Sequence, residues 1–177
     1  MSSACKGLGS AFVVLALALG SGALSSFAAG DDISLPTRKA GLWEMKTTMD
    51  EGGGPREHTI RMCIEADMER NTVQANILEH LESCKKYEVK RGDVTTVDAE
   101  CKFNGADVIS YTEMRGDFTK AFEVKIKSTT IPPMTTQAQT VSIKRTIVQN
   151  GAYVGESCGE LQPGEASSAD GTKVMVQ

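Results

Sequence analysis

The chain is poor in the residue types that build catalytic and nucleic-acid-binding sites. Of its 177 residues only 5% are aromatic, with one Trp and two histidines, His58 and His80. Its lysines and arginines form no clusters, which argues against nucleic-acid binding and against a basic amphipathic face for anionic membranes. A His-containing triad or a histidine metal pair would need partners that the sequence does not place. We therefore expect no nucleic-acid partner, no cofactor, no metal and no enzymatic activity.

The one long apolar run is too short to span a bilayer. It covers residues 11–19, follows the positively charged Lys6 and precedes small residues around Phe27. We interpret residues 1–28 as a secretory signal peptide cleaved after Ala28, with an uncleaved anchor helix as the alternative. Removing 28 of the 177 residues leaves 149, which is the size of one domain. After this cleavage we expect no stable membrane anchor. Without Lys6 there are 18 basic and 23 acidic residues, a net charge of −5.

Closely spaced cysteine pairs, which zinc sites need, are missing as well. Cys5 precedes the apolar run, and the other cysteines lie at least 17 residues apart. An even number of cysteines in an exported domain predicts two disulfides. The four cysteines are Cys63, Cys84, Cys101 and Cys158.

What the sequence does contain is an alternation of period two that begins at the only Trp. Trp43 and every second residue up to Met49 would share one face of a half-buried strand, with polar residues opposite. A glycine-rich turn at 51–55 and a second alternating segment at 58–64 complete a hairpin. The residues predicted for the core, or for the wall of a deformable apolar pocket, are Trp43, Met45, Met49 and Met62.

The period changes over residues 65–82, where the spacing of apolar residues predicts a helical excursion. Asn71 followed by Gln74 resembles an N-cap, so we predict two short helices that meet at Asn71 and fold back on each other. Further strands are predicted at 85–91, 94–103, 108–115, 118–128, 140–149 and 153–158. Their hairpin turns are predicted at Gly92-Asp93, Gly116-Asp117 and Asn150-Gly151.

These segments predict a mainly β fold. We expect an antiparallel up-and-down meander of about eight strands, closed as a barrel or open as a curved half-barrel, with an immunoglobulin-like sandwich as the alternative. A flexible leader at 29–40 precedes a single β domain at 41–159, and a polar tail at 160–177 is predicted to be disordered.

The register of the hairpin at Gly92-Asp93 decides the cysteine pairing. A two-residue turn would place Cys84 opposite Cys101, whereas a register one residue longer aligns Tyr87 with Ala99 and separates the two cysteines. Cys63 and Cys84 both fall on polar faces, and Cys101 falls on an apolar one. Bridging Cys63 to Cys84 requires the two helices to fold back, because bridged Cα atoms lie within about 7 Å. The predicted bridges are Cys63–Cys84 and Cys101–Cys158.

Two charged patterns have structural explanations. Glu65, Asp67 and Glu69 form an acidic cluster that suits a helix start, because the helix dipole favours negative charge there. A calcium site would need a liganding loop that is missing. The Arg-Gly-Asp triplets at 91–93 and 115–117 both fall where a hairpin turn is expected.

Four short segments together resemble one known family. They are Gly-Leu-Trp-Glu-Met at 41–45, Arg-Met-Cys at 61–63, the span from Cys84 to Cys101, and Gly-Glu-Ser-Cys at 155–158. The chain resembles the domain of unknown function 3617 family of exported proteobacterial proteins over about residues 39–159. The resemblance implies a periplasmic location and brings no catalytic residues.

We therefore expect a periplasmic, disulfide-stapled binding module without enzymatic activity. The methionines and the meander favour a lipid or an apolar small molecule as the ligand. The alternative is a protein-interaction or envelope-accessory module that binds an envelope protein through an exposed strand edge.

Overall fold

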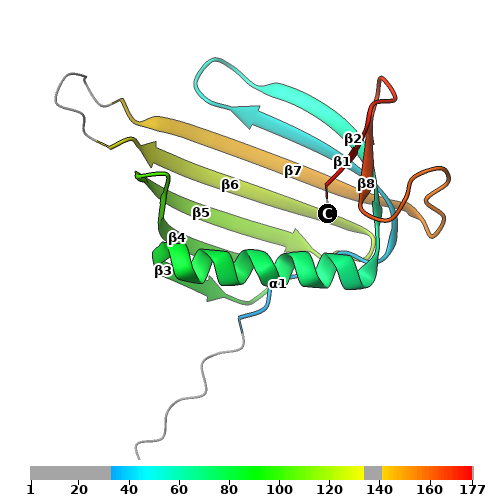
Figure 1. The fold of residues 1–177 in the computed structure, drawn as a ribbon, viewed down its shortest axis with the longest axis horizontal. Helices are drawn as coiled ribbons and strands as arrows, with labels where there is room; N and C mark the ends of the chain where they lie inside the picture. Colours follow the sequence, from blue (N-terminus) through cyan, green and yellow to red (C-terminus); the bar gives the residue numbers. More distant parts are fainter. Residues whose placement is uncertain (1–32, 134–140, 177) are drawn as a thin grey trace, which may run out of the picture. The chain divides into compact units, whose positions relative to one another are not determined.

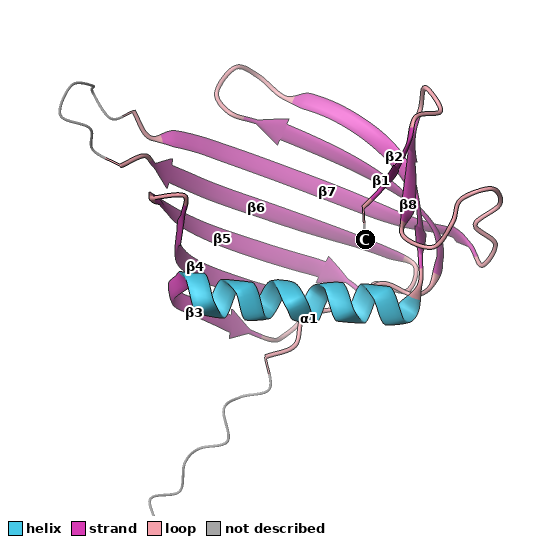
Figure 2. Ribbon diagram, in the orientation of Figure 1, coloured by secondary structure: helices cyan, strands magenta, loops and turns pink. Residues whose placement is uncertain are grey.

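The computed structural model describes residues 33–133 and 141–176, and the predicted signal peptide at 1–28 lies outside these residues. The described part consists of one antiparallel sheet of nine strands and one helix, shown in Figures 1 and 2. In chain order the elements are β1 (Gly41–Asp50), β2 (Arg56–Ile64), α1 (Ala66–Ser83), β3 (Cys84–Lys90), β4 (Thr95–Phe103), β5 (Ala106–Gly116), β6 (Ala121–Ile131), β7 (Ile143–Gly155), β8 (Glu165–Ser168) and β9 (Lys173–Met175).

The strand order confirms the mainly β, antiparallel fold. Strands β3 to β7 form an up-and-down meander, and the hairpin of β1 and β2 then follows β7, giving the order β3-β4-β5-β6-β7-β1-β2-β8-β9. Strand β1 thus lies inside the sheet, paired with β2 on one side and β7 on the other. The edges β3 and β9 do not pair with each other among the described residues, so the sheet is open. Of the two predicted forms, the open sheet is confirmed and the closed barrel is wrong.

The cross-strand registers assign each side chain to one of two faces. Trp43, Met45 and Thr47 lie on the same face as their partners in β2 and β7. The helix covers part of this face: the ring of His80 lies 5.5 Å from that of Tyr87 and 5.9 Å from that of Phe103, and α1 contacts strands β3 and β4. Figure 1 shows α1 lying lengthwise along the β3 and β4 side of the sheet. We call this face the helix-side face and the opposite one the outer face.

A single helix replaces the two short helices that the sequence predicted. The side chain of Glu65 caps it by accepting a 2.8 Å hydrogen bond from the backbone N–H of Met68. The helix therefore begins at Ala66 and runs through Asn71, where the second short helix was predicted to start. With 18 residues α1 is about 27 Å long at 1.5 Å per residue. Its length separates Cys63 from Cys84, and this excludes the predicted bridge between them.

The observed disulfides are Cys63–Cys158 and Cys84–Cys101, so the predicted pairing is wrong. The longer register of the β3–β4 hairpin was predicted correctly, since Tyr87 lies opposite Ala99. The register shifts between Cys84 and Lys86, however, so Lys85 is an extra residue and Cys84 returns to a position opposite Cys101. The sequence reasoning assumed one register along the whole hairpin and missed this bulge.

The Asn150-Gly151 dipeptide forms no turn, because β7 runs through it without interruption. Gly151 lies opposite Phe122, and a β-carbon on Gly151 would stand 2.1 Å from a carbon of the Phe122 ring. The glycine thus makes room for an aromatic ring inside the sheet. The predicted hairpin at this position is wrong.

The segment after Gly159 is ordered where the sequence predicted a disordered tail. Strand β8 pairs with β2 and places Ala166 in the core at 1% exposure, and β9 pairs with β8. The backbone N–H of Gly164 also donates to the carbonyl of Cys63. Pairing to an existing sheet edge compensates for the weak strand propensity of Glu165–Ser168, so this part of the prediction is wrong.

Candidate functional site

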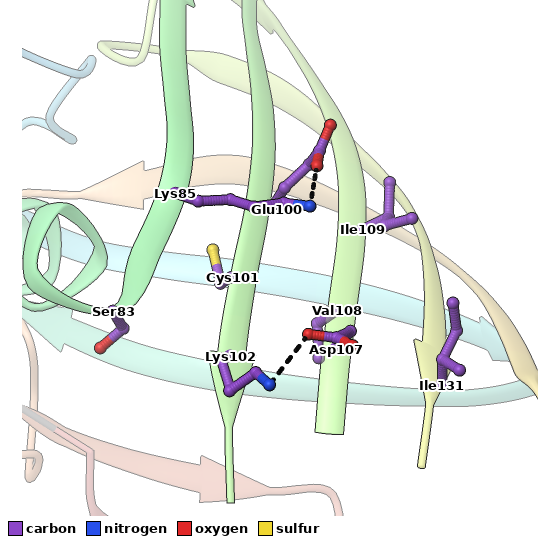
Figure 3. Close-up of a pocket in the computed structure, with 9 residues that line it drawn as sticks. All are labelled: Ser83, Lys85, Glu100, Cys101, Lys102, Asp107, Val108, Ile109 and Ile131. Carbon is purple, nitrogen blue, oxygen red and sulfur yellow. Dashed lines mark ion pairs between the residues drawn. The ribbon is translucent and has the colours of Figure 1, made fainter. Parts of the chain in front are cut away.

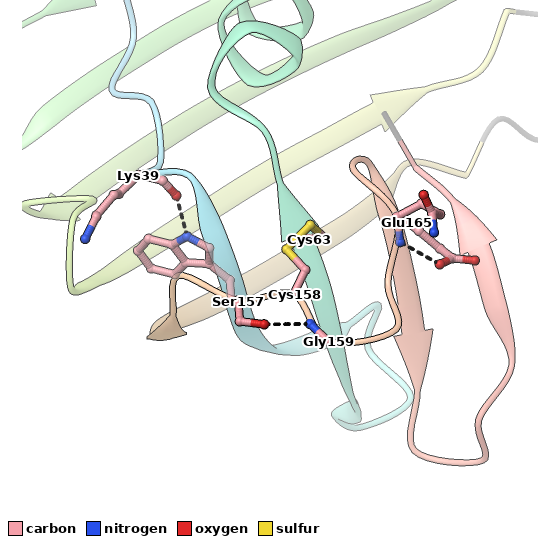
Figure 4. Close-up of a disulfide and its surroundings, with 8 residues drawn as sticks. Lys39, Cys63, Ser157, Cys158, Gly159 and Glu165 are labelled. Carbon is pink, nitrogen blue, oxygen red and sulfur yellow. Dashed lines mark hydrogen bonds between the residues drawn. A yellow bond between two sulfur atoms is a disulfide. The ribbon is translucent and has the colours of Figure 1, made fainter.

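Trp43 is the centre of the packed core, as predicted. Its exposure is 0%, its ring lies 5.5 Å from those of Phe122 and Tyr153, and its indole Nε1 donates a 2.8 Å hydrogen bond to the carbonyl of Lys39 (Figure 4). The other buried members of this cluster are Met45, Met62, Ile64, Phe118, Phe122 and Ala166. Met45 and Met62 are thus core residues, and only Met49 of the four predicted residues lies half-buried outside the cluster.

Part of the predicted leader is held against this core. The guanidinium of Arg38 pairs with Glu69 of α1 at 2.6 Å, and its Nη1 lies 3.1 Å from the sulfur of Met45. The side chains of Arg38 and Glu69 are 17% and 4% exposed. The leader at 29–40 is therefore fixed at Arg38 and Lys39, which corrects the expectation that all of it is flexible.

An apolar row continues across the helix-side face beyond the core. The register places Val97, Thr112, Ile126, Ile147 and Met49 side by side on five consecutive strands. Val97 is buried, whereas the other four are half-buried. The backbone of α1 comes closest to β3 and β4, the strands at the Val97 end of this row. We call Thr112, Ile126, Ile147 and Met49 the apolar strip.

The strip ends at a charged cluster. Arg56 lies opposite Met49, and Arg145 precedes Ile147 by two residues, so both arginines are on the helix-side face. Both bind the carboxylate of Glu51, Arg145 through Nε at 2.7 Å and Arg56 through Nη2 at 3.0 Å. The Arg145 guanidinium lowers the pKa of Glu51 below its usual range. A depression of about 420 Å³ adjoins the cluster at residues 51–56.

A second, apolar depression lies elsewhere, beside the Cys84–Cys101 disulfide (Figure 3). It measures about 290 Å³ and is lined by Val108, Ile109 and Ile131 among others. Its two lysines are both paired, Lys85 with Glu100 at 2.8 Å and Lys102 with Asp107 at 3.6 Å. The pairing with Glu100 raises the pKa of Lys85. No unpaired charge on these lysines is left to recognise a ligand.

The histidines and the acidic cluster have positions that suit structural roles. His80 packs between two aromatic rings with its Nδ1 2.6 Å from the carbonyl of Asn76, while His58 is exposed on β2. Glu65 caps α1, Asp67 pairs with Arg70 and Glu69 pairs with Arg38. Within residues 33–133 and 141–176 no three His, Cys, Asp or Glu side chains gather as metal ligands. The described helix is not apolar enough to cross a membrane.

The segments that frame the core are those that carry a family relationship. The family model described as a protein of unknown function, DUF3617, matches residues 38–158, from Arg38 at the core to Cys158 in the first disulfide. The chain belongs to the DUF3617 family. Neither the curated proteins nor the solved structures gave a match to this DUF3617 chain. The matched range covers β1 to β7 and both disulfides, and the two disulfides fit an exported protein.

Sequence reasoning found Met49 of the strip but missed Thr112 and Ile126 and the role of Arg145. The available signal was the alternation of β7, in which Arg145 occupies a position between the apolar Ile143 and Ile147 on one face. A charged residue on an apolar face marks either a functional position or the end of the packed region. Only the register of β1 and β7 shows that Glu51 and Arg56 meet Arg145 there.

Proposed function

We propose that this protein is a periplasmic binding module without enzymatic activity, exported by a cleaved signal peptide, that binds a lipid or another apolar molecule on the helix-side face. The observation that carries this proposal is the apolar strip. Half-buried Thr112, Ile126, Ile147 and Met49 extend the apolar face beyond the packed core. Covering them with an apolar ligand would gain about 25 cal/mol for each Å² removed from water.

The partial cover by α1 supports the same proposal. The helix buries only Glu69 and Ile77 and leaves Leu78 and Leu81 about half exposed, at 52% and 43%. The backbone of α1 comes closest to β3 and β4, whereas the strip lies on the next four strands, β5, β6, β7 and β1. All four cysteines of the β domain lie in disulfides, so none supplies the thiolate that a cysteine nucleophile would need.

The test uses paired substitutions on the two faces of β7. Ile147→Gln changes the strip, and Val148→Gln changes the adjacent half-buried residue on the outer face. We expect the wild type and V148Q to bind the fluorescent apolar probe 1-N-phenylnaphthylamine equally, and I147Q to bind it at least fivefold more weakly. Native mass spectrometry of protein purified from its own periplasm should show a bound lipid. Absence of both a co-purified ligand and probe binding would overturn the proposal.

A second candidate, binding of an envelope protein, rests on the difference between the two sheet edges. The β3 edge carries a bulge at Lys85 and several lysines, features that discourage pairing with another chain. The β9 edge exposes Val174 and Met175 at 51% and 62%. Such an edge suits addition of a partner strand. A photo-crosslinker at Val174 should then trap one specific envelope protein in cells, and random crosslinks would argue against it.

A further inference from the structure

The charged cluster at the end of the apolar strip carries more positive than negative charge. Two guanidinium groups, those of Arg56 and Arg145, share the single carboxylate of Glu51. Arg56 binds one oxygen of that carboxylate and Arg145 the other. The lowered pKa of Glu51 keeps it ionised at neutral pH, so the three groups together carry one net positive charge.

The cluster is accessible to a ligand. The arginine side chains are 72% and 43% exposed, and Glu51 with Arg56 lines the depression of about 420 Å³ formed by the glycine-rich turn. A guanidinium has five N–H donors in a planar fork that matches a carboxylate or a phosphate. Glu51 occupies only part of this donor set, so an anion can bind both arginines without displacing it.

The two arginines of the cluster lie next to residues of the apolar strip. Arg56 lies directly opposite Met49, and Arg145 lies two residues from Ile147 on the same face of β7. Two residues along a strand span about 7 Å. A molecule whose chain covers Met49 and Ile147 therefore brings its end group to the two arginines.

From this juxtaposition we infer that the ligand is an anionic amphiphile, whose hydrocarbon chain lies on the strip and whose carboxylate or phosphate head binds Arg56 and Arg145. This inference rests on the proposed function and narrows its ligand class. Neutral apolar molecules would use the strip alone and bind more weakly. Glu51 pairs with both arginines and weakens anion binding by its own charge.

The experiment compares ligands that differ only in the head group. Binding of palmitate and of methyl palmitate is measured by displacement of 1-N-phenylnaphthylamine from the full-length mature protein. We expect the wild type to bind palmitate at least tenfold more tightly than the ester. The double variant Arg56→Gln/Arg145→Gln should lose this preference and bind the ester as the wild type does. Arg61→Gln, which removes an exposed arginine paired with Glu44 on the outer face, should keep the preference.

Glu51→Gln separates ligand binding from a merely structural role of the cluster. If the arginines bind the head group, removing the competing carboxylate should strengthen palmitate binding several-fold and leave ester binding unchanged. If the cluster only fixes the turn, E51Q should weaken both or neither. Binding of lysophosphatidic acid and of lysophosphatidylcholine is then compared, to distinguish an anionic phosphate head group from a zwitterionic one. A site specific for carboxylates would bind palmitate and neither lysolipid.

The outcomes separate the two proposals. Equal affinity for palmitate and its methyl ester would overturn the anionic head group and leave the apolar binding function standing. A preference for palmitate that survives in R56Q/R145Q would overturn the assignment of the head-group site to these arginines. Failure of both ligands and of the probe to bind would overturn the proposed function itself, together with this inference.

Discussion

The ring of Phe122 occupies the space above Gly151 on the neighbouring strand, at a directly paired position of β6 and β7. Phe122 also stacks on Phe118 at 4.9 Å with the two ring planes 4° apart, and it contacts Trp43. One glycine in the middle of a strand therefore permits three aromatic side chains to pack as a unit. The cost of a glycine inside a strand is offset by this packing.

Gly151→Ala should consequently destabilise the protein. Its methyl group would stand 2.1 Å from the Phe122 ring and force the ring out of its packed position, a change that costs about 2 kcal/mol in comparable overpacked cores. The urea midpoint measured by tryptophan fluorescence should fall accordingly. Gly155→Ala on the same strand is the matched control, since its β-carbon would have no neighbour within 4 Å. Equal stability of the two variants would contradict this account of Gly151.

The disulfides can be checked by peptide mapping of the non-reduced protein, which should yield peptides that join Cys63 to Cys158 and Cys84 to Cys101. The loops closed have sequence separations of 95 and 17 residues. By chain entropy, C63S/C158S should lose about 5 kcal/mol of unfolding free energy and C84S/C101S about 3 kcal/mol. A larger loss from the second variant would show that the Cys84–Cys101 bridge contributes more than loop closure.

The ion pair between Arg38 and Glu69 should contribute more to the stability of the fold than the exposed ion pair between Asp67 and Arg70. Glu69→Gln leaves the largely buried Arg38 guanidinium without its carboxylate. Breaking a fully buried pair in this way lowers the free energy of unfolding by about 3 kcal/mol, and the loss here should be somewhat smaller because Arg38 is partly exposed. Asp67→Asn removes the exposed partner of Arg70 on the same turn of α1 and should cost less than about 1 kcal/mol. Urea denaturation of both variants compares them directly. A fall in the midpoint of D67N as large as that of E69Q would contradict the ranking.

How far the sequence predicts the fold is shown by its two Asn-Gly dipeptides. Asn104-Gly105 joins β4 to β5 with both residues at positive φ, as a two-residue hairpin turn requires, whereas Asn150-Gly151 lies inside a strand. The local signal is the same in both places. What differs is Phe122, which is distant in sequence and packs over the second glycine only. Periodicity therefore located the strands, but long-range packing decided where one strand ended.

In the candidate site, too, some residues could be predicted from the sequence and others could not. Trp43 and its alternating neighbours were predictable because one strand carries the whole pattern. The cluster of Glu51, Arg56 and Arg145 was not, because it depends on β1 lying between β2 and β7. The sequential hairpins predicted a meander that closes on the first strand or stays open, and no local feature indicated which later strand would lie beside β1 or in which register.

The turn between β5 and β6 gives a prediction for acid stability. There the Oδ1 of Asp117 accepts hydrogen bonds from the backbone N–H groups of Thr119 and Lys120, both at 2.9 Å. These bonds lower the pKa of Asp117 relative to its ordinary value of about 3.9. They also hold the turn in which Phe118 adopts a positive φ of 55° and enters the core. The ionised carboxylate is thus tied to the position of a core aromatic ring.

Because the pKa of Asp117 is lower in the folded chain than in the unfolded chain, the unfolded chain binds more protons in the interval between the two values. The stabilisation is complete above the unfolded pKa and is lost as the pH falls through the folded pKa. As the pH is lowered from about 5 to about 2, the urea midpoint of the Asp117→Asn variant should therefore fall less than that of the wild type. Asp93→Asn removes the same charge from the other Arg-Gly-Asp triplet and serves as the control. If D117N and the wild type lose stability in parallel over this range, the hydrogen bonds to Asp117 do not stabilise the turn through its charge.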